Sequence, residues 1–148
     1  MTGPAGAGAT ATEKAAAPLP VPDRLTEPFW EHARAGRLAF QHCDSCRAYQ
    51  HPPGPVCRAC YARDLTFQPV SGRGRVYTYT VTHHRVVPGF DEAPYAVALV
   101  EMEEQEGLRM LANIRELPPS GVHVGLEVEV LFEALPNGLA LPQFRPRR

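Results

Sequence analysis

The sequence lacks the features that mark membrane, exported and nucleic-acid-binding proteins. No stretch approaches the roughly 20 apolar residues of a membrane span, and the start has no basic segment followed by an apolar core, as a secretory signal has. Net charge is nearly absent, because 15 Lys and Arg residues balance 16 Asp and Glu residues and give a formal net charge of -1. No overall basic field therefore attracts nucleic acid or an anionic membrane. We expect a cytoplasmic protein, in a compartment that keeps thiols reduced.

Large apolar side chains are missing from the first 20 residues, where after Met1 none occurs before Leu19. Small residues, proline and glycine dominate this segment, so it cannot bury enough surface to offset the entropy lost on ordering. We predict a disordered leader over residues 1–20. The patterns that follow divide the rest into a helix plus metal-binding ribbon over residues 21–68 and a barrel domain over residues 69–145.

Cysteine is scarce, and every cysteine lies between positions 43 and 60. Cys43, Cys46, Cys57 and Cys60 form the pattern C-x2-C-x10-C-x2-C. Two such knuckles place four thiolates around one ion, so the spacing indicates a structural zinc site. A rubredoxin-like iron centre uses the same ligands, whereas a thioredoxin-like redox pair requires a strand-helix context and a single CxxC. Because four thiolates fill the coordination sphere, we expect no catalysis at the metal.

The stretch "PDRLTEPFWEHARAG" predicts a short amphipathic helix, because its apolar residues recur near helical spacing. Asp23 and Thr26 are candidate N-terminal caps, and Gly36 is a candidate stop. Phe29 and Trp30 leave two interpretations open. They pack on the neighbouring module, or they contact a partner, as large aromatic anchors do.

Five segments after residue 70 read as short strands. They cover Val76–Thr82, Tyr95–Met102, 108–114, 122–132 and 139–144. Because no helical period separates most of them, we predict a closed or nearly closed barrel of the OB-fold type. The expected fold class is mainly β, with an N-terminal helix, a four-cysteine zinc ribbon and a five-stranded OB-fold barrel.

Side-chain alternation along two of these strands predicts which faces are buried. Tyr77 and Tyr79 share the face opposite the threonines, so we expect them to point inward. Tyr95–Met102 is apolar on both faces, which predicts that the barrel covers one face and that the helix or a partner covers the other. The glutamates of the following turn are interpreted as a solvated acidic tip.

Candidate ligand contacts and acid-base groups are few. Arg73 and Arg75 flank Gly74, and two cations on a glycine-rich turn can meet a phosphate, so we name them as candidate partner or CoA contacts beside plain surface charge. His83 and His84 precede two acidic residues and suggest acid-base work. A polar strand end is the simpler interpretation, because no nucleophile motif accompanies them.

An OB barrel also raises the alternative of a single-stranded nucleic-acid-binding protein, in which bases stack on aromatic residues in a basic groove. Two observations make nucleic acid an unfavoured partner. The tyrosines are expected to point inward, and the polar face of the 122–132 strand carries Glu127, Glu129 and Glu133. These carboxylates would repel a phosphate backbone.

The chain resembles a known family in the order of its motifs. A helix, two CxxC pairs around a Pro-rich loop, "SGRGRVYTYTVTHH" and "APYAVALVEMEEQEGLRMLANI" follow one another. This order is similar to that of the rubredoxin-like zinc-ribbon plus OB-fold proteins of bacteria and archaea. The likeness covers Pro22 to Phe144, and "SGRGRVYTYT" is its most specific part. Arg47 departs from the glycine that many ribbons carry after the second cysteine of a knuckle.

Membership of that family implies an accessory role. Its members accompany thiolase-like enzymes and lipid-transfer-protein-type aldolases that cleave steroid side-chain CoA thioesters, and some assemble with hot-dog-fold enoyl-CoA hydratases. The resemblance thus implies a subunit that binds a thiolase-fold partner, assists binding or channelling of acyl-CoA, and has no activity alone. It also implies Cys43, Cys46, Cys57 and Cys60 as the zinc ligands. A free-standing hydrolase using His83 or His84 is the third hypothesis.

Overall fold

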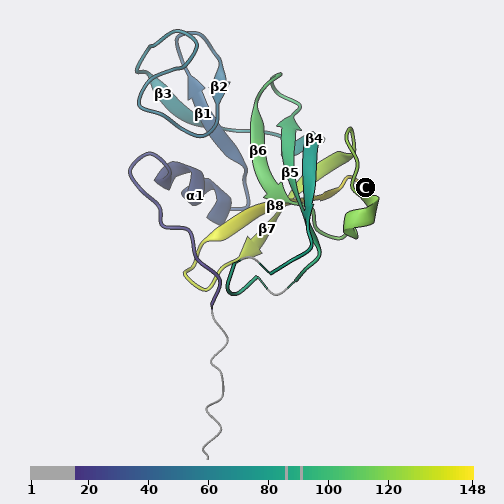
Figure 1. Ribbon diagram of the computed structural model, residues 1–148. Helices are drawn as coiled ribbons and strands as arrows, with labels where there is room; N and C mark the ends of the chain where they lie inside the picture. The colour runs from purple at the N-terminus through teal and green to yellow at the C-terminus, as the bar shows by residue number, and fades with distance from the viewer. Residues whose placement is uncertain (1–15, 86, 91) are drawn as a thin grey trace, which may run out of the picture.

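The fold combines a short helix, a three-stranded ribbon and a five-stranded barrel (Figure 1). The computed structural model describes residues 16–85, 87–90 and 92–148. The elements are α1 (Glu27–Arg34), β1 (Ala39–Cys43), β2 (Tyr49–Gln50), β3 (Leu65–Pro69), β4 (Arg73–Thr82), β5 (Tyr95–Met102), β6 (Arg109–Asn113), a 3-10 turn η1 (Pro119–Gly121), β7 (Glu127–Ala134) and β8 (Ala140–Pro146). The ribbon sheet has the order β2-β1-β3 and the barrel sheet the order β6-β5-β4-β7-β8. The predicted fold class is confirmed.

Local chemistry fixes the two ends of α1. One carboxylate oxygen of Asp23 accepts the backbone N–H groups of Leu25 and Thr26, at 3.0 and 2.8 Å, and so organises the turn before the helix. Gly36 follows the helix at a φ of 72°, a left-handed conformation that glycine adopts without steric cost. Phe29 and Ala33, one helical turn apart, are the buried residues of α1, and the helix lies against β1, β3 and β8.

The barrel closes where the end of β6 meets β8, and this place is called the β6–β8 seam. β4 pairs with both β5 and β7, whereas β6 and β8 meet through one parallel bridge between Ile114 and Phe144. Beside that bridge, the side-chain oxygen of Gln143 accepts the backbone N–H of Asn113 at 2.8 Å. Phe144 is fully buried inside, and the core continues without interruption to Phe40 of the ribbon. Ribbon and barrel therefore share one hydrophobic core.

The expectation that Tyr77 points inward is wrong, because this residue is 48% exposed. Tyr79 lies on the inward face, since it pairs with the fully buried Ala98, but it is still 37% exposed. The register of β4 against β5 shifts between Val76 and Thr78, so Tyr77 is the extra residue of a bulge. Its ring lies on the outer face under the guanidinium of Arg109, 3.5 Å from the centroid. Tyr79 lies beyond the part of β4 that pairs with β7, which ends at Arg75.

The outer face of β5 is only partly covered by the chain itself, so a partner on this face stays a prediction. The inward residues of β5, Ala96 and Val100 among them, are buried, but the alternate residues remain half-buried. α1 packs mainly against β1, β3 and β8 and does not supply this cover. Within the part of the chain that the structure describes, no helix is long and apolar enough to cross a membrane.

Candidate metal centre and ribbon–barrel junction

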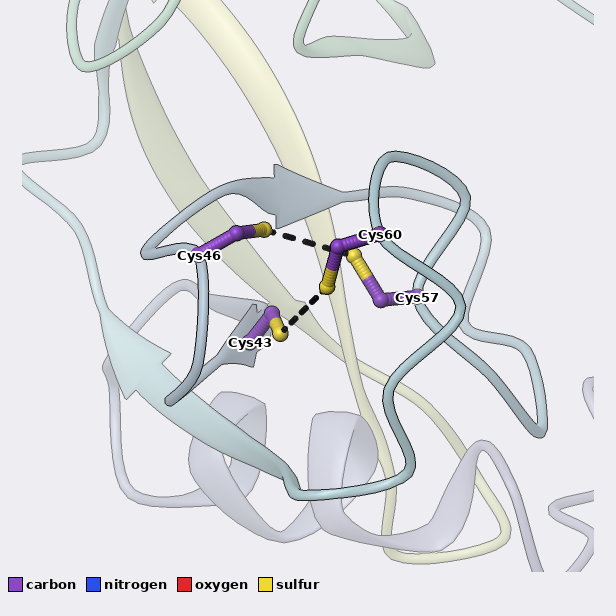
Figure 2. A group of neighbouring side chains, drawn as sticks. All are labelled: Cys43, Cys46, Cys57 and Cys60. Atoms are coloured by element: carbon purple, nitrogen blue, oxygen red, sulfur yellow. Dashed lines mark hydrogen bonds between the residues drawn. The ribbon is translucent and has the colours of Figure 1, made fainter.

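The two CxxC knuckles face each other across a small space (Figure 2). The four Sγ atoms of Cys43, Cys46, Cys57 and Cys60 all lie within 4.8 Å of one another, and the closest pairs, Cys43–Cys60 and Cys46–Cys57, are 3.6 Å apart. Tetrahedral coordination with metal–sulfur bonds of about 2.3 Å separates sulfurs by about 3.8 Å. The four cysteines therefore form a group with the size and donor chemistry of a four-thiolate metal site.

Each knuckle turns through a left-handed residue directly after its second cysteine. Arg47 has a φ of 68° and Tyr61 a φ of 63°. Their backbone N–H groups bond the carbonyls of Cys43 and Cys57, at 2.8 and 2.9 Å. Many ribbons carry glycine at the Arg47 position because this conformation costs an ordinary residue about 1–2 kcal/mol. Arg47 thus differs from the usual glycine in residue type but adopts the same left-handed backbone conformation.

Backbone donors favour the thiolate form of Cys57, whereas burial and the neighbouring thiols raise the pKa of Cys46 and Cys60. The N–H of Cys60, with a further contribution from the N–H of Ala59, lowers the pKa of the Cys57 thiol to about 7. The Ala59 nitrogen lies 3.4 Å from the Cys57 sulfur. Cys43 and Cys57 are buried, whereas Cys46 and Cys60 reach the surface. The thiolate is the form of cysteine that binds metals.

Two buried glutamines hold the Pro-rich loop between the knuckles. The Gln41 oxygen accepts the amide N–H of Gln50 at 2.6 Å and the backbone N–H of Gly54 at 2.8 Å. The Gln50 oxygen accepts the backbone N–H of Arg58 at 2.9 Å, beside the second knuckle. Sequence reasoning did not identify these residues. The sequence did contain one signal, because both glutamines lie on strands of a small module. A polar side chain buried there needs a hydrogen-bond partner.

His51 forms the aromatic junction between ribbon and helix. Its ring lies 5.6 Å from that of Phe29 and 4.9 Å from that of Phe40. Burial, and secondarily the positive charge of Arg58, lowers the pKa of His51 to about 4. The neutral imidazole is therefore the form that the folded protein holds at neutral pH.

We expect this histidine to make stability depend on pH. The unfolded chain takes up the proton near pH 6.5 and the folded chain only near pH 4, so the stabilisation is complete above pH 6.5 and is lost as pH falls toward 4. At pH 5.5 the loss is about 1.4 kcal/mol. Urea unfolding at pH 7.5 and 5.5 should show a smaller change for His51→Phe than for the exposed-residue control His84→Phe. Equal changes in the two variants would contradict the assignment.

The turn between β5 and β6 reaches the ribbon, and it contains a residue that sequence reasoning missed. The Gln105 oxygen accepts the backbone N–H of Tyr49 at 2.8 Å, and its amide nitrogen donates to the Tyr49 carbonyl at 2.9 Å. Glu104 accepts the backbone N–H of Ser71 at 2.6 Å, and Glu103 pairs with Arg73. The acidic residues are exposed, as expected, but the turn is a structural junction as well as a solvated tip.

The predicted partner contacts lie in different surroundings. Phe29 is 6% exposed and packs in the shared core, whereas Trp30 is half-buried and meets its ring edge-on. For Phe29 the structure thus supports the packing alternative over a partner contact. Arg73 and Arg75 are exposed and paired with Glu103 and Glu127, at 3.1 and 3.2 Å. A phosphate would compete with these carboxylates, and a contact with CoA remains a prediction.

His83 and His84 follow β4 and are exposed. Of the two acidic residues beyond them, Asp91 lies outside the described residues, and Glu92 pairs with Arg115 at 3.2 Å. Among the residues that the structure describes, neither histidine hydrogen-bonds a carboxylate or a hydroxyl group. Among the described residues, the two histidines therefore form no acid-base pair of the kind that hydrolysis requires.

In the part of the barrel that the structure describes, most arginines are neutralised by a carboxylate. The arginines of the strands and of the C-terminal tail each pair with a glutamate: Arg73, Arg75, Arg109, Arg115, Arg145, Arg147 and Arg148. The exposed Tyr77 weakens one of the two arguments against nucleic acid, but its ring already stacks with Arg109. The second argument, that the barrel's carboxylates repel a phosphate backbone, is strengthened. A nucleic-acid groove needs cations that are not neutralised by carboxylates.

A cavity of about 580 Å³ lies over the seam between β6 and β8. Apolar side chains, among them Leu19, Phe90 and Leu141, line much of it. Arg115 lies at its polar side, held by Glu133 at 2.6 Å. Its mainly apolar wall suits an aliphatic or alicyclic group.

Comparison with known proteins gives the following matches. Residues 30–66 match the family described as "ChsH2, rubredoxin-like zinc ribbon domain", and residues 67–133 match "ChsH2, C-terminal OB-fold domain". A "DUF35 domain-containing scaffold protein" of Methanocaldococcus jannaschii is 31% identical over 76% of this chain and 80% of its own length. A solved structure titled "Ltp2-ChsH2(DUF35) aldolase" contains a chain that is 40% identical with a TM-score of 0.77, covering 86% of this chain and 98% of that one.

Two longer relatives carry hydratase names. A "Probable enoyl-CoA hydratase alpha subunit" of Thermomonospora curvata is 38% identical over 90% of this chain. The "3-oxo-4,17-pregnadiene-20-carboxyl-CoA hydratase alpha subunit" of Mycobacterium tuberculosis is 33% identical over 80% of it. The chain spans about two fifths of their lengths, 41% and 37%.

Proposed function

Because the chain belongs to the DUF35 family, with a ChsH2-type zinc ribbon followed by an OB-fold, we propose that it is a non-catalytic subunit of an acyl-CoA enzyme. Its partner is a thiolase-fold enzyme, either a thiolase or an aldolase that cleaves steroid side-chain CoA thioesters. Similarity to a chain of an aldolase complex over 98% of that chain's length supports this proposal most directly. The hydratase names of two relatives add a hot-dog-fold hydratase as a further partner of the same complex.

The metal in this proposal is a zinc ion with a structural role. Cys43, Cys46, Cys57 and Cys60 would hold it, and four thiolates leave no position at which a water or a substrate could bind. Zinc suits the group because soft thiolate donors in a tetrahedron are its usual structural environment. The ion would fix the knuckles and, through Gln50 and the loop, the aromatic junction around His51.

The acyl-CoA part of the proposal draws on the cavity above the β6–β8 seam. Its apolar wall of Leu19, Phe90 and Leu141 has the chemistry to contact an acyl group or a steroid ring system. Trp30 and the half-buried outer face of β5 are surfaces on which the enzyme can dock. In this arrangement the partner supplies the catalytic residues, and this chain supports a retro-aldol cleavage without contributing its base.

A turnover assay of the purified chain tests the absence of catalysis. With β-hydroxyacyl-CoA and enoyl-CoA thioesters, we expect no aldolase, hydratase or thioesterase activity above that of buffer. A His83→Ala/His84→Ala double variant is the matched sample, and we expect the same result for it. Enzyme-like turnover by the chain alone would refute the accessory role. Loss of that turnover in the double variant would support the free-standing hydrolase in its place.

A further inference from the structure

Gln105 makes an unusual pair of contacts between the barrel and the ribbon. Its primary amide presents a carbonyl and an N–H group side by side, as a peptide unit does. Both bond the backbone of the same residue, Tyr49, at 2.8 and 2.9 Å. Because β2 is an edge strand of the ribbon sheet, Gln105 takes the place of one residue of an added strand. An unpaired strand edge otherwise exposes backbone N–H and carbonyl groups that can pair with another chain and cause aggregation.

The contact joins the first cysteine knuckle of the ribbon to the turn between β5 and β6 of the barrel. Tyr49 follows the first knuckle, three positions after Cys46, and its strand lies beside β1 with Gln50 opposite Gln41 and Tyr49 opposite His42. On the other side, the turn is fixed to the start of β4, where Glu104 accepts the Ser71 N–H. The backbone N–H of Glu103 also donates to the Arg73 carbonyl, at 3.0 Å. A small pocket lies beside the contact, lined by Cys57 and Leu108 among others.

We propose that Gln105 is a positioning residue that couples metal binding in the ribbon to the conformation of the β5–β6 turn. A metal ion that fixes the first knuckle holds Tyr49 in place, and Tyr49 then holds the turn through Gln105. Loss of the metal frees the backbone of Tyr49. The turn that joins β5 and β6 then loses its contact with the ribbon. The inference rests on the proposed metal site and is independent of which enzyme the chain binds.

Such a coupling is reciprocal. If the metal stabilises the turn through Gln105, then Gln105 must strengthen metal binding by the same factor. Removal of two hydrogen bonds of ordinary net strength should weaken zinc affinity about tenfold. Gln105→Met keeps the length of the side chain and removes both bonds. Glu106→Met is the matched control, because Glu106 is the exposed neighbour and its side chain has no hydrogen bond or ion pair among the described residues.

Two measurements on the full chain test the proposal. Competition with a chromophoric chelator gives the zinc affinity, for which we expect a loss of about tenfold in Gln105→Met and no change in Glu106→Met. Amide hydrogen exchange by NMR gives the local effect. In the zinc-loaded protein the Tyr49 amide should exchange at least about tenfold faster in Gln105→Met, because Gln105 is its acceptor. Chelation should speed exchange at Leu108 of the turn in the wild type and add little in the variant.

Protection of the Val100 and Met110 amides in the barrel core shows whether the variant is folded. If Gln105→Met does not fold, Gln105→Glu replaces it. The carboxylate still accepts the Tyr49 N–H but cannot donate to its carbonyl, so an intermediate loss of affinity is expected. Wild-type zinc affinity in a folded variant, or equal effects of chelation on the turn in both proteins, would overturn the coupling. A wild-type chain that binds no metal would overturn the proposed zinc site itself.

Discussion

Replacement of Cys57 with Ser is expected to unfold the ribbon. Cys57 is 1% exposed and supplies one of four sulfurs that lie within 4.8 Å of one another. A serine hydroxyl is a poor zinc ligand, and the free energy of binding at a structural zinc site, on the order of 10 kcal/mol in small zinc-binding domains, is folding free energy. The variant should lose its zinc, as measured by mass spectrometry of metal content, and its melting transition should fall to a much lower temperature than that of the wild type.

Ala59→Ser is the matched control for this prediction. It introduces the same hydroxyl group into the same knuckle, at an exposed position whose side chain is not a ligand. Zinc content and melting should stay at wild-type values. Chelation of the wild-type protein should reproduce the Cys57→Ser result. A protein without any of the four cysteines that melts normally and forms its complex would contradict a structural metal.

Replacement of Phe40 with Ala should have the second largest effect. Phe40 is fully buried and belongs to the core shared by ribbon and barrel, where it contacts the rings of Phe29 and His51. The cavity left by a buried phenylalanine costs about 3–5 kcal/mol. Urea unfolding should show that loss in one transition, because both modules depend on the same core. Leu111→Ala on the outer face, where Leu111 is 66% exposed, should change stability by less than about 0.5 kcal/mol.

Separate ribbon and barrel transitions in Phe40→Ala, with the barrel transition unchanged, would contradict the shared core. The ribbon would then be an independent unit tied to the barrel by its linker. The distinction matters for function, because a partner that binds both modules needs them held in one arrangement.

Sequence patterns predicted the parts of the fold that depend on local chemistry. Cysteine spacing predicted the knuckles because metal geometry constrains it directly, and residues 108–114 were predicted as a strand, which the structure has as β6. Tyr77 was misplaced because a bulge adds one residue and reverses the alternation after it. A single strand carries no mark of its partner's register, so this error could not be avoided from the sequence.

The junction between modules escaped prediction for a related reason. Gln105 stands among three glutamates in a turn, where polar residues normally face water, and its partner is the backbone of Tyr49, 56 positions away. Backbone partners leave no pattern in side-chain identity. Gln41 and Gln50 bond a loop in the same manner and were missed for the same cause.

Co-purification tests the accessory role most directly. The chain, tagged and expressed in its native cells, is recovered under mild conditions, and the proteins that elute with it are identified by mass. We predict a thiolase-fold enzyme in a fixed ratio to the chain, lost from the eluate of Cys57→Ser and retained with Ala59→Ser. Elution of the wild-type chain without any enzyme, or with salt-sensitive nucleic acid in its place, would contradict the account.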